Sequence, residues 1–385
     1  MKRSLWRKRI WRSIEKNRPE FIGLTLQRYP SFVLSDRCQS LEMTPAFGLH
    51  AITGERLRPL LAFLAENRYR TLTMNEYVER RTLGRRERAH DVLLTFDDGH
   101  RSLYTDVFPL LRDYGFCATA YVVPGEIPAV NEQQSWRGQL CSWPEIQEMH
   151  ASGVVEFQSH SMYHKSIPVS PQVLEFVRPG VPNNFLISDL WPVRRTGTRD
   201  MPADQLPLGT PIHDWGSRFR ERPAFIEDPT VVADCVEYVT SHGGATFFAA
   251  HDWWTRLMSV VRAGRKRTTT TVGFESPEDQ RQAILRDLLD SKHLLERMLP
   301  GKQVRHFCFP WYRGSELASR ISTEAGYISN AWGSQLPRFA ADEALPLAIM
   351  RLPPYYLWRL PGRGRRSLAS LLVQRFSSYT TTTGL

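Results

Sequence analysis

The strongest constraint on the fold is a regular alternation of apolar runs and amphipathic stretches between residues 91 and 160. Between Asp91 and the final Asp97–Asp98 pair, DVLLTFDD (91–98) forms a continuous, mainly apolar run, as strands do when both faces of a parallel sheet are covered. CATAYVV (117–123) and VVEFQSH (154–160) repeat this pattern, with room for one helix between successive runs. Strands that alternate with helices of this length predict an α/β fold with parallel strands and right-handed crossovers, either an open doubly wound sheet or a barrel.

Helix signals occupy the intervals between these runs. The stretch 101–115 ends on Gly115, which predicts a helix C-cap. Ser142 precedes Glu145 by three positions, which predicts a capping box at the start of the next helix. The further expected elements are a strand over 43–52 that ends near His50, a helix, turn and short helix over 54–81, a helix over 276–300, a strand over 304–310, a helix over 315–326 and a strand over 327–332. We expect the stretch 345–358 to close the domain.

Residues 168–275 interrupt this rhythm. They are rich in Pro, Arg and Thr and are too long for a plain loop in a compact domain. We therefore expect an insertion with structure of its own. The net charge of +10 is concentrated at the chain ends, which predicts a basic leader over 1–40 and a basic tail over 361–385.

Composition excludes several classes of protein. The chain has 385 residues, of which 42% are apolar and 23% charged, as in ordinary globular proteins, and no run of about 18 apolar residues predicts a membrane span. The five cysteines are scattered without a C-x-x-C pair, and the N-terminus lacks the apolar stretch of a signal peptide. We expect a cytoplasmic protein whose basic ends either stay solvated or contact the inner face of a membrane. No nucleic-acid-binding motif accompanies them, so no nucleic-acid partner is expected.

Titratable side chains follow three of the predicted strands at the points where the strands end. Asp97 and Asp98 end one strand, His160 ends another and His50 ends the first, while His164 follows His160 by four residues. Carboxyl ends of parallel strands meet at the same end of an α/β sheet or barrel. Adjacent carboxylates raise each other's pKa, so a positive partner is expected beside them. On one helical turn, two histidines four residues apart would face one cation.

One carboxylate and two imidazoles leave coordination positions open, which is typical of a catalytic metal site. The second aspartate would then be free to act as a base toward water on the metal. Each motif alone has an ordinary explanation, because D-D-G often forms a turn and H-x-x-x-H often marks two polar helix residues. Their joint occurrence at strand ends, about 60 residues apart, is what indicates a metal site.

LLTFDDG followed by FQSHSMYH closely resembles the polysaccharide deacetylase family, the NodB-homology carbohydrate esterases. Residues 49–78 are similar to the leader of its biofilm-polysaccharide branch, 141–164 to the helix–strand unit before its histidines, and 304–327 to its third motif. The resemblance covers about 43–167 and 276–333. It implies a distorted (β/α) barrel of about seven strands over 41–360, interrupted by the insertion at 168–275.

The resemblance also implies a reaction. Asp98, His160 and His164 would bind a divalent metal, usually zinc, and Asp97 would be the general base on metal-bound water. That water would attack the carbonyl of an N-acetyl group on a sugar of a polysaccharide or lipid-linked glycan, and acetate and a free amine would leave. Such a hydrolase would serve exopolysaccharide biosynthesis. O-acetyl ester or cyclic amide cleavage uses the same chemistry, and the insertion would select the substrate.

Two departures from the family pattern bear on activity. Many members carry an arginine that holds the catalytic aspartate two residues before the proline of the third motif, and here that residue is Cys308. The leucine-x-histidine motif that supplies the general acid near the C-terminus is not evident. His50 is the first substitute for that acid and His251 a distant second. A sugar-binding or scaffolding relative without activity, part of a polysaccharide synthesis complex, is the alternative that these departures favour.

The third motif also offers candidate substrate contacts. Its strand is followed by Pro310, Trp311, Tyr312 and Arg313. The two aromatic rings could stack on sugar rings or could simply pack in the core. The arginine could contact a polar or acidic group of the substrate.

Overall fold

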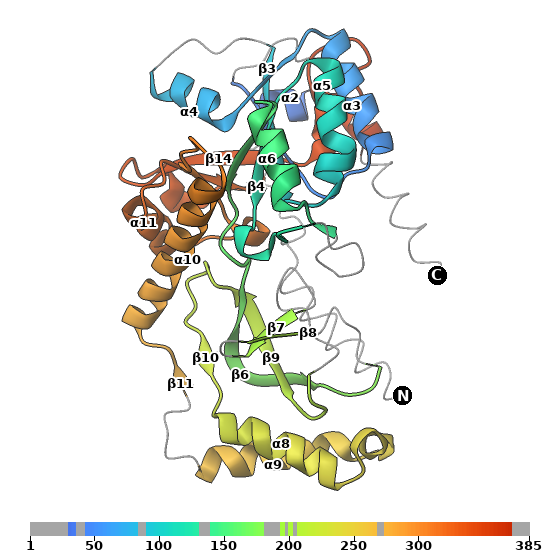
Figure 1. Cartoon of the computed structure of the whole chain (residues 1–385), viewed down its shortest axis with the longest axis vertical. Helices are drawn as coiled ribbons and strands as arrows, with labels where there is room; N and C mark the ends of the chain where they lie inside the picture. The colour runs from blue at the N-terminus through green and yellow to red at the C-terminus, as the bar shows by residue number, and fades with distance from the viewer. Residues whose placement is uncertain are drawn as a thin grey trace. The chain divides into compact units, whose positions relative to one another are not determined.

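The structure is a computed structural model that describes a large part of the chain in two compact units. One unit contains residues 164–284, and the other contains the described residues before 164 and from 285 onward (Figure 1). The predicted leader lies almost entirely outside the described residues, as does much of the predicted tail. The described ranges are 30–35, 43–83, 90–130, 139–180, 193–196, 199–202, 206–267 and 273–371.

Parallel strands close a barrel in the larger unit. Their order is β1-β14-β13-β12-β5-β4-β3, and β3 pairs with β1 to complete the ring. The short strand β2 (Arg70–Leu72) lies outside the ring and pairs with the amino half of β3. This closed ring confirms the predicted barrel of about seven strands and excludes the open sheet. The ring strands are β1 (Ala46–Leu49), β3 (Asp91–Asp98), β4 (Ala118–Val122), β5 (Val155–Ser159), β12 (His306–Cys308), β13 (Ser329–Trp332) and β14 (Leu347–Leu352).

Helices cover the outside of the barrel, as the alternating sequence predicts. Gly115 takes the left-handed conformation, with φ of 66°, at the C-cap of α5, which confirms the predicted helix end. The predicted capping box of Ser142 and Glu145 is present at the start of α6. The barrel unit contains the helices α2 (Ser31–Leu34), α3 (Gly54–Glu66), α4 (Met74–Thr82), α5 (Phe108–Tyr114), α6 (Trp143–Ala151) and α11 (Glu316–Glu324), and α10 (Pro277–Met298) runs into it.

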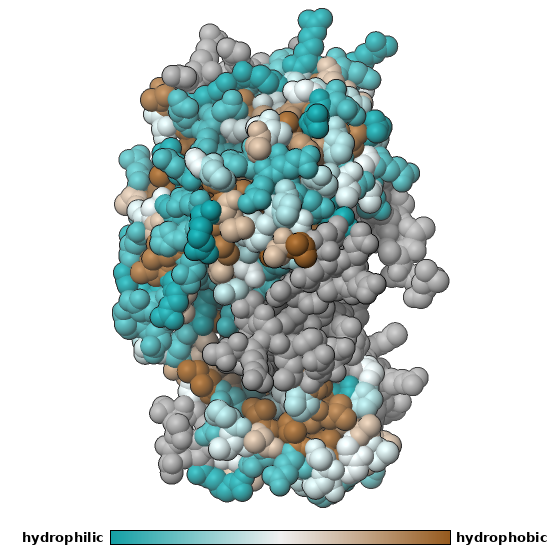
Figure 2. Space-filling view, in the orientation of Figure 1, coloured by the Kyte–Doolittle hydropathy of each residue, from teal (hydrophilic) through white to brown (hydrophobic). Residues whose placement is uncertain are grey.

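Burial explains why the strands read as apolar runs. All eight residues of β3 are buried, because the strand faces the barrel interior on one side and the helices on the other. Leu93, Tyr121, Ala331 and Ile349, each from a different strand, pack together in one cluster of the interior. The visible outer face of this unit carries mainly hydrophilic side chains with scattered apolar ones (Figure 2).

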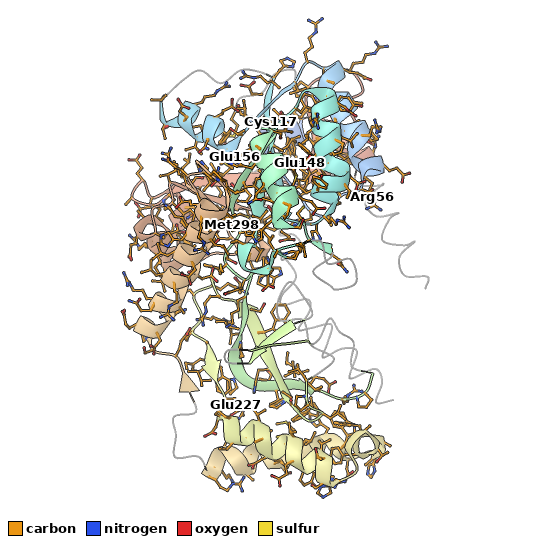
Figure 3. All side chains as sticks on the ribbon, in the orientation of Figure 1. Arg56, Cys117, Glu148, Glu156, Glu227 and Met298 are labelled. Atoms are coloured by element: carbon orange, nitrogen blue, oxygen red, sulfur yellow. The ribbon has the colours of Figure 1, made fainter. Side chains whose placement is uncertain are left out.

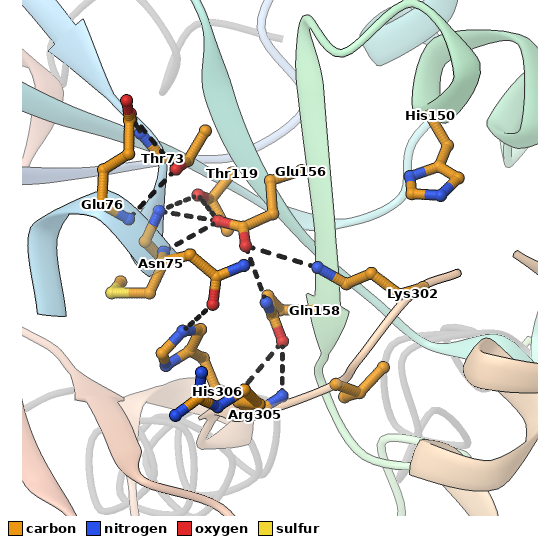
Figure 4. Close-up of polar contacts among 12 residues, drawn as sticks. Thr73, Asn75, Glu76, Thr119, His150, Glu156, Gln158, Lys302, Arg305 and His306 are labelled. Carbon is orange, nitrogen blue, oxygen red and sulfur yellow. Dashed lines mark hydrogen bonds and ion pairs between the residues drawn. The ribbon is translucent and has the colours of Figure 1, made fainter. Parts of the chain in front are cut away.

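A buried polar network joins the amino ends of β5 and β12 to helix α4 (Figure 4). The Glu156 carboxylate accepts hydrogen bonds from the backbone N–H groups of Met74 and Asn75, at 2.7 and 3.2 Å, and it pairs with the Lys302 ammonium at 3.3 Å. The His306 ring hydrogen-bonds Asn75 Oδ1 at 2.9 Å. This network satisfies the first N–H groups of α4 and holds that helix against the barrel.

The smaller unit is built from antiparallel strand pairs and a pair of helices. Phe176 of β6 packs against Trp253 and Trp254 of α9, beside a cluster that includes Val231 of α8. Glu227, labelled in Figure 3, forms an ion pair with Arg265. The predicted insertion at 168–275 lies within the residue range of this unit, and its boundaries stay a prediction. The elements are β6 (Ser166–Phe176) paired with β9 (Pro211–Ser217), β7 (Val193–Thr196) with β8 (Arg199–Pro202), β10 (Phe225–Ile226) with β11 (Gly273–Phe274), and helices α8 (Pro229–Ser241) and α9 (Trp253–Arg267).

Across the described residues, no helix combines the length and the apolar character needed to cross a membrane.

Candidate active site

The titratable residues predicted from strand ends do come together at the carboxyl end of the barrel. Asp97 and Asp98 are the last residues of β3, and His50 directly follows β1. The ladder pairs Asp98 with Val122 of β4, whose carbonyl in turn accepts the His160 N–H at 2.9 Å. The strand register therefore fixes His160 beside the two aspartates.

Histidine side chains surround the Asp98 carboxylate. His160 Nε2 lies 3.3 Å from Oδ1, and His50 Nδ1 lies 3.6 Å from Oδ2. His100 Nε2 lies 3.7 Å from the same Oδ2. His100 was not among the predicted site residues, although it follows the D-D-G turn directly in the sequence.

The chemistry of this donor set fits a divalent cation. One ligand atom each of Asp98, His160 and His164 lies within 4.8 Å of the others. The Nδ1–H of His160 donates to the Cys308 carbonyl at 2.8 Å, and this hydrogen bond turns Nε2 toward Asp98. Metal-binding histidines are typically oriented in this way by a hydrogen bond from the other ring nitrogen.

The prediction that His160 and His164 share one helical turn is wrong. No helix covers residues 160–164, and the backbone there is irregular, with φ of 73° at Ser161 and 51° at His164. The conformation of this irregular loop, and not helical spacing, brings the two imidazoles close to each other. The predicted juxtaposition is therefore present, but it has a different structural cause.

Arg351 of β14 holds the other aspartate. Its guanidinium donates to both oxygens of Asp97, at 2.6 and 2.9 Å, and also contacts Thr95 Oγ1 at 3.0 Å and Cys308 Sγ at 2.8 Å. Arg351 and Asp97 are both fully buried. Burial alone would raise the pKa of Asp97, but the Arg351 charge and hydrogen bonds, with the charge of His160, hold that pKa below its usual value.

Arg351 therefore supplies the positive partner that Cys308 cannot. The sequence did contain a signal for it, because Arg351 is the single charged residue of the run 345–358. Asp97, His160 and Cys308 also bring ligand atoms within 4.8 Å of one another. A cation bound there would sit against the Arg351 guanidinium, so the electrostatics favour the group that contains Asp98.

The predicted substrate-contact residues follow β12. Pro310 is buried, while Trp311, Tyr312 and Arg313 are half-buried. The Tyr312 hydroxyl hydrogen-bonds Nε2 of His50, and the Arg351 guanidinium lies 5.0 Å from the Tyr312 ring centroid. Tyr312 thus contacts both the histidine and the arginine of the site, and the predicted role of all four residues in sugar binding stays a prediction.

His50 combines exposure with a negative surrounding. Its side chain is 48% exposed, so it can meet a molecule that arrives from solvent. Partial burial lowers the pKa of His50, but the contact with Asp98 and the charges of Asp97 and Asp98 raise it by more, so the net shift is upward. His251, the second candidate for a general acid, lies on an exposed turn of the smaller unit.

Comparison with known proteins finds similarity to the same family that the motifs resemble. The family model described as polysaccharide deacetylase matches residues 84–178. A poly-beta-1,6-N-acetyl-D-glucosamine N-deacetylase of Staphylococcus epidermidis is 24% identical over 112 residues, which is 29% of this chain and 37% of that protein. A protein of the same name from Escherichia coli K12 is 30% identical over 112 residues, which is 27% of this chain and 17% of that protein.

The chain therefore spans well under half the length of these two curated relatives. Among solved structures, a deacetylase domain from Bordetella bronchiseptica superposes with a TM-score of 0.49 at 18% identity. That alignment covers 82% of this chain and 90% of the other.

Proposed function

We propose that this protein is a metal-dependent hydrolase that removes acetyl groups from N-acetylated sugars of a polysaccharide or lipid-linked glycan. The observation that carries the proposal is the division between the two adjacent aspartates. Asp98 faces imidazoles, whereas Asp97 is held by Arg351 and stays ionised. A chain that matches the polysaccharide deacetylase model thus keeps both a metal-ligand group and a separate base.

A divalent cation would be held by Asp98, His160 and His164, and zinc suits one carboxylate with two imidazoles. When bound, it would supply Lewis acidity for the acetyl carbonyl and would lower the pKa of water. Asp97 would take the proton from the attacking water, since its carboxylate is ionised and lies beside Asp98. Positioned general bases of this kind contribute typically 10²–10⁴-fold to rate.

His50 would return a proton to the leaving amine. Its imidazole is the most exposed of the histidines around Asp98, with 48% of the side chain exposed against 23% for His100 and 2% for His160. A substrate entering from solvent would therefore meet His50 first. His100 lies at nearly the same distance from Asp98 and is the second residue in reach of such a substrate.

The paired Asp97 argues against the scaffolding alternative. Metal or sugar binding alone needs only Asp98 and the histidines, whereas taking Asp97 and Arg351 out of water costs several kcal/mol per ion before their attraction is counted. The names of the matched relatives suggest polymers of N-acetylglucosamine as the first substrates to test. We further propose that the protein acts at the inner face of a membrane, because the basic residues at both ends of the sequence could contact anionic lipid.

Acetate release tests the proposal. The purified protein would be incubated with N-acetylglucosamine oligomers, with and without a chelator, and with an O-acetylated sugar as comparison. Chelator-sensitive acetate release from the N-acetylated oligomers is the expected result. Release from the O-acetylated sugar alone would assign the site to ester hydrolysis. A metal-loaded protein that releases acetate from neither would contradict the proposal and favour the scaffolding alternative.

A further inference from the structure

Both ring nitrogens of His50 face a polar group. Nε2 hydrogen-bonds the Tyr312 hydroxyl, and Nδ1 lies 3.6 Å from Asp98 Oδ2. The His50 and Tyr312 rings meet edge to face, with centroids 5.5 Å apart and an interplanar angle of 75°. A half-exposed imidazole without such contacts would sample several rotamers, and ordering it at the moment of reaction would cost entropy.

The backbone places Tyr312 in this position at a conformational cost. Trp311 and Tyr312 have φ values of 51° and 59°, in the left-handed region, where the Cβ of a non-glycine residue comes too close to the backbone. Such a strained backbone conformation persists only where the surrounding structure holds it in place, and it is frequent at functional sites. A Cβ at Gly333 would lie 2.9 Å from Tyr312 Cβ, so the absence of a side chain at Gly333 makes room for the tyrosine.

The contacts also define which atoms carry hydrogen. Burial raises the pKa of Tyr312, so its hydroxyl keeps its proton and can donate to a neutral imidazole. The Asp98 carboxylate can only accept. The neutral His50 ring therefore carries its hydrogen on Nδ1, toward Asp98, and accepts at Nε2 from Tyr312.

We propose that Tyr312 is a positioning residue that fixes the orientation and the tautomer of His50 above Asp98. An effect of Tyr312 on turnover rests on the function proposed above. Its effect on the orientation and tautomer of His50 does not. The ring of the same tyrosine also contacts the Arg351 guanidinium, whose central carbon lies 5.0 Å from the ring centroid. Tyr312 thus links the histidine side of the site to the arginine that holds Asp97.

Tyr312→Phe separates the hydroxyl contact with His50 from the ring contact with Arg351, because it removes the hydroxyl and keeps the ring. The first readout is ¹⁵N NMR of the histidine rings in the full chain, at a pH where they are neutral, with His50→Gln used to assign the signal. The wild-type His50 signal should report hydrogen on Nδ1, and Tyr312→Phe should shift it toward the Nε2 tautomer or a mixture. Tyr104→Phe, which removes a surface hydroxyl bound to Glu148 at 2.7 Å, is the matched control.

The second readout is turnover. Tyr312→Phe should lower kcat by about 10-fold or more, with KM and metal content unchanged. In a His50→Ala background, adding Tyr312→Phe should have no further effect on kcat, because the tyrosine acts through the histidine. Gly333→Ala, which crowds Tyr312 but keeps its hydroxyl, provides a second route to the same change in tautomer.

An unchanged His50 tautomer in Tyr312→Phe would overturn the proposal, as would losses of kcat that multiply in the double variant. If the wild-type protein releases no acetate, the function proposed above fails, and the NMR readout still decides whether Tyr312 fixes His50. The two proposals can therefore fail independently.

Discussion

The Arg351 guanidinium on β14 donates to both carboxylate oxygens of Asp97 on β3, at 2.6 and 2.9 Å, although the residues are 254 positions apart. Both side chains are fully buried. This pair shows why two aspartates can stand together at a strand end, because each has its own positive environment. Asp97 has the guanidinium, and Asp98 has the imidazoles.

Arg351→Met should destabilise the protein by about 3–5 kcal/mol, because it leaves a buried carboxylate without its cation. Adding Asp97→Asn should recover part of this loss, since the uncompensated charge is then removed. Denaturant unfolding of the two single variants and the double variant measures the coupling. Arg305→Met, at an exposed arginine of the same unit, is the control. Strictly additive losses would show that Asp97 and Arg351 are not energetically paired.

His160→Ala should remove the metal. His160 is buried, and its Nε2 is oriented toward Asp98 by the hydrogen bond from Nδ1 to the Cys308 carbonyl. Metal analysis after dialysis against a weak chelator compares this variant with His150→Ala, a half-buried histidine at the other end of α6 from its capping box. A His160→Ala protein that keeps one metal per chain would remove this residue from the ligand set.

Stability should fall when the pH drops from 7 to 5, in part because of His306. Burial lowers the pKa of His306 from 6.5 to about 4. Below pH 6.5 the unfolded state binds a proton that the folded state does not take up until about pH 4, so acid favours unfolding. The contribution between pH 7 and 5 is about 2 kcal/mol.

Urea unfolding at the two pH values checks this contribution, with His306→Gln as the test variant. The variant should show a smaller loss of stability on acidification than the wild type, and His150→Gln serves as the control. Equal pH dependence in wild type and His306→Gln would contradict the assignment. The neighbouring Glu156 carboxylate also has a lowered pKa, so its stabilising contacts are lost only as the pH falls further, below the usual range for glutamate.

The parts of the site that follow strand ends could be predicted from the sequence. A continuous apolar run such as 91–98 places its last residues at the end of a buried strand, and parallel pairing then gathers Asp97, Asp98, His50 and His160. Arg351 could not be placed in this way. Neither spacing nor periodicity shows which strands, far apart in the sequence, become neighbours when the barrel closes. The one sequence signal for Arg351 is its charge within the otherwise uncharged run 345–358.

Loop conformation was the second limit on prediction. The H-x-x-x-H spacing predicts a helical turn, yet positive φ values at Ser161 and His164 define an irregular loop. The hydroxyl contact of Tyr312 with His50 joins residues 262 positions apart and depends on two consecutive left-handed residues. No propensity indicates such a conformation for tryptophan followed by tyrosine.

The central claim is that Asp98 binds the metal whereas Asp97 acts as the base, and one variant tests it most directly. Metal content and acetate release from N-acetylglucosamine oligomers would be measured on the same sample of Asp97→Asn. The amide keeps the shape of the carboxylate but cannot take a proton from water. We predict about one divalent metal per chain and a loss of turnover of at least about 100-fold. Acetate release at the wild-type rate, or loss of the metal, would contradict the assignment.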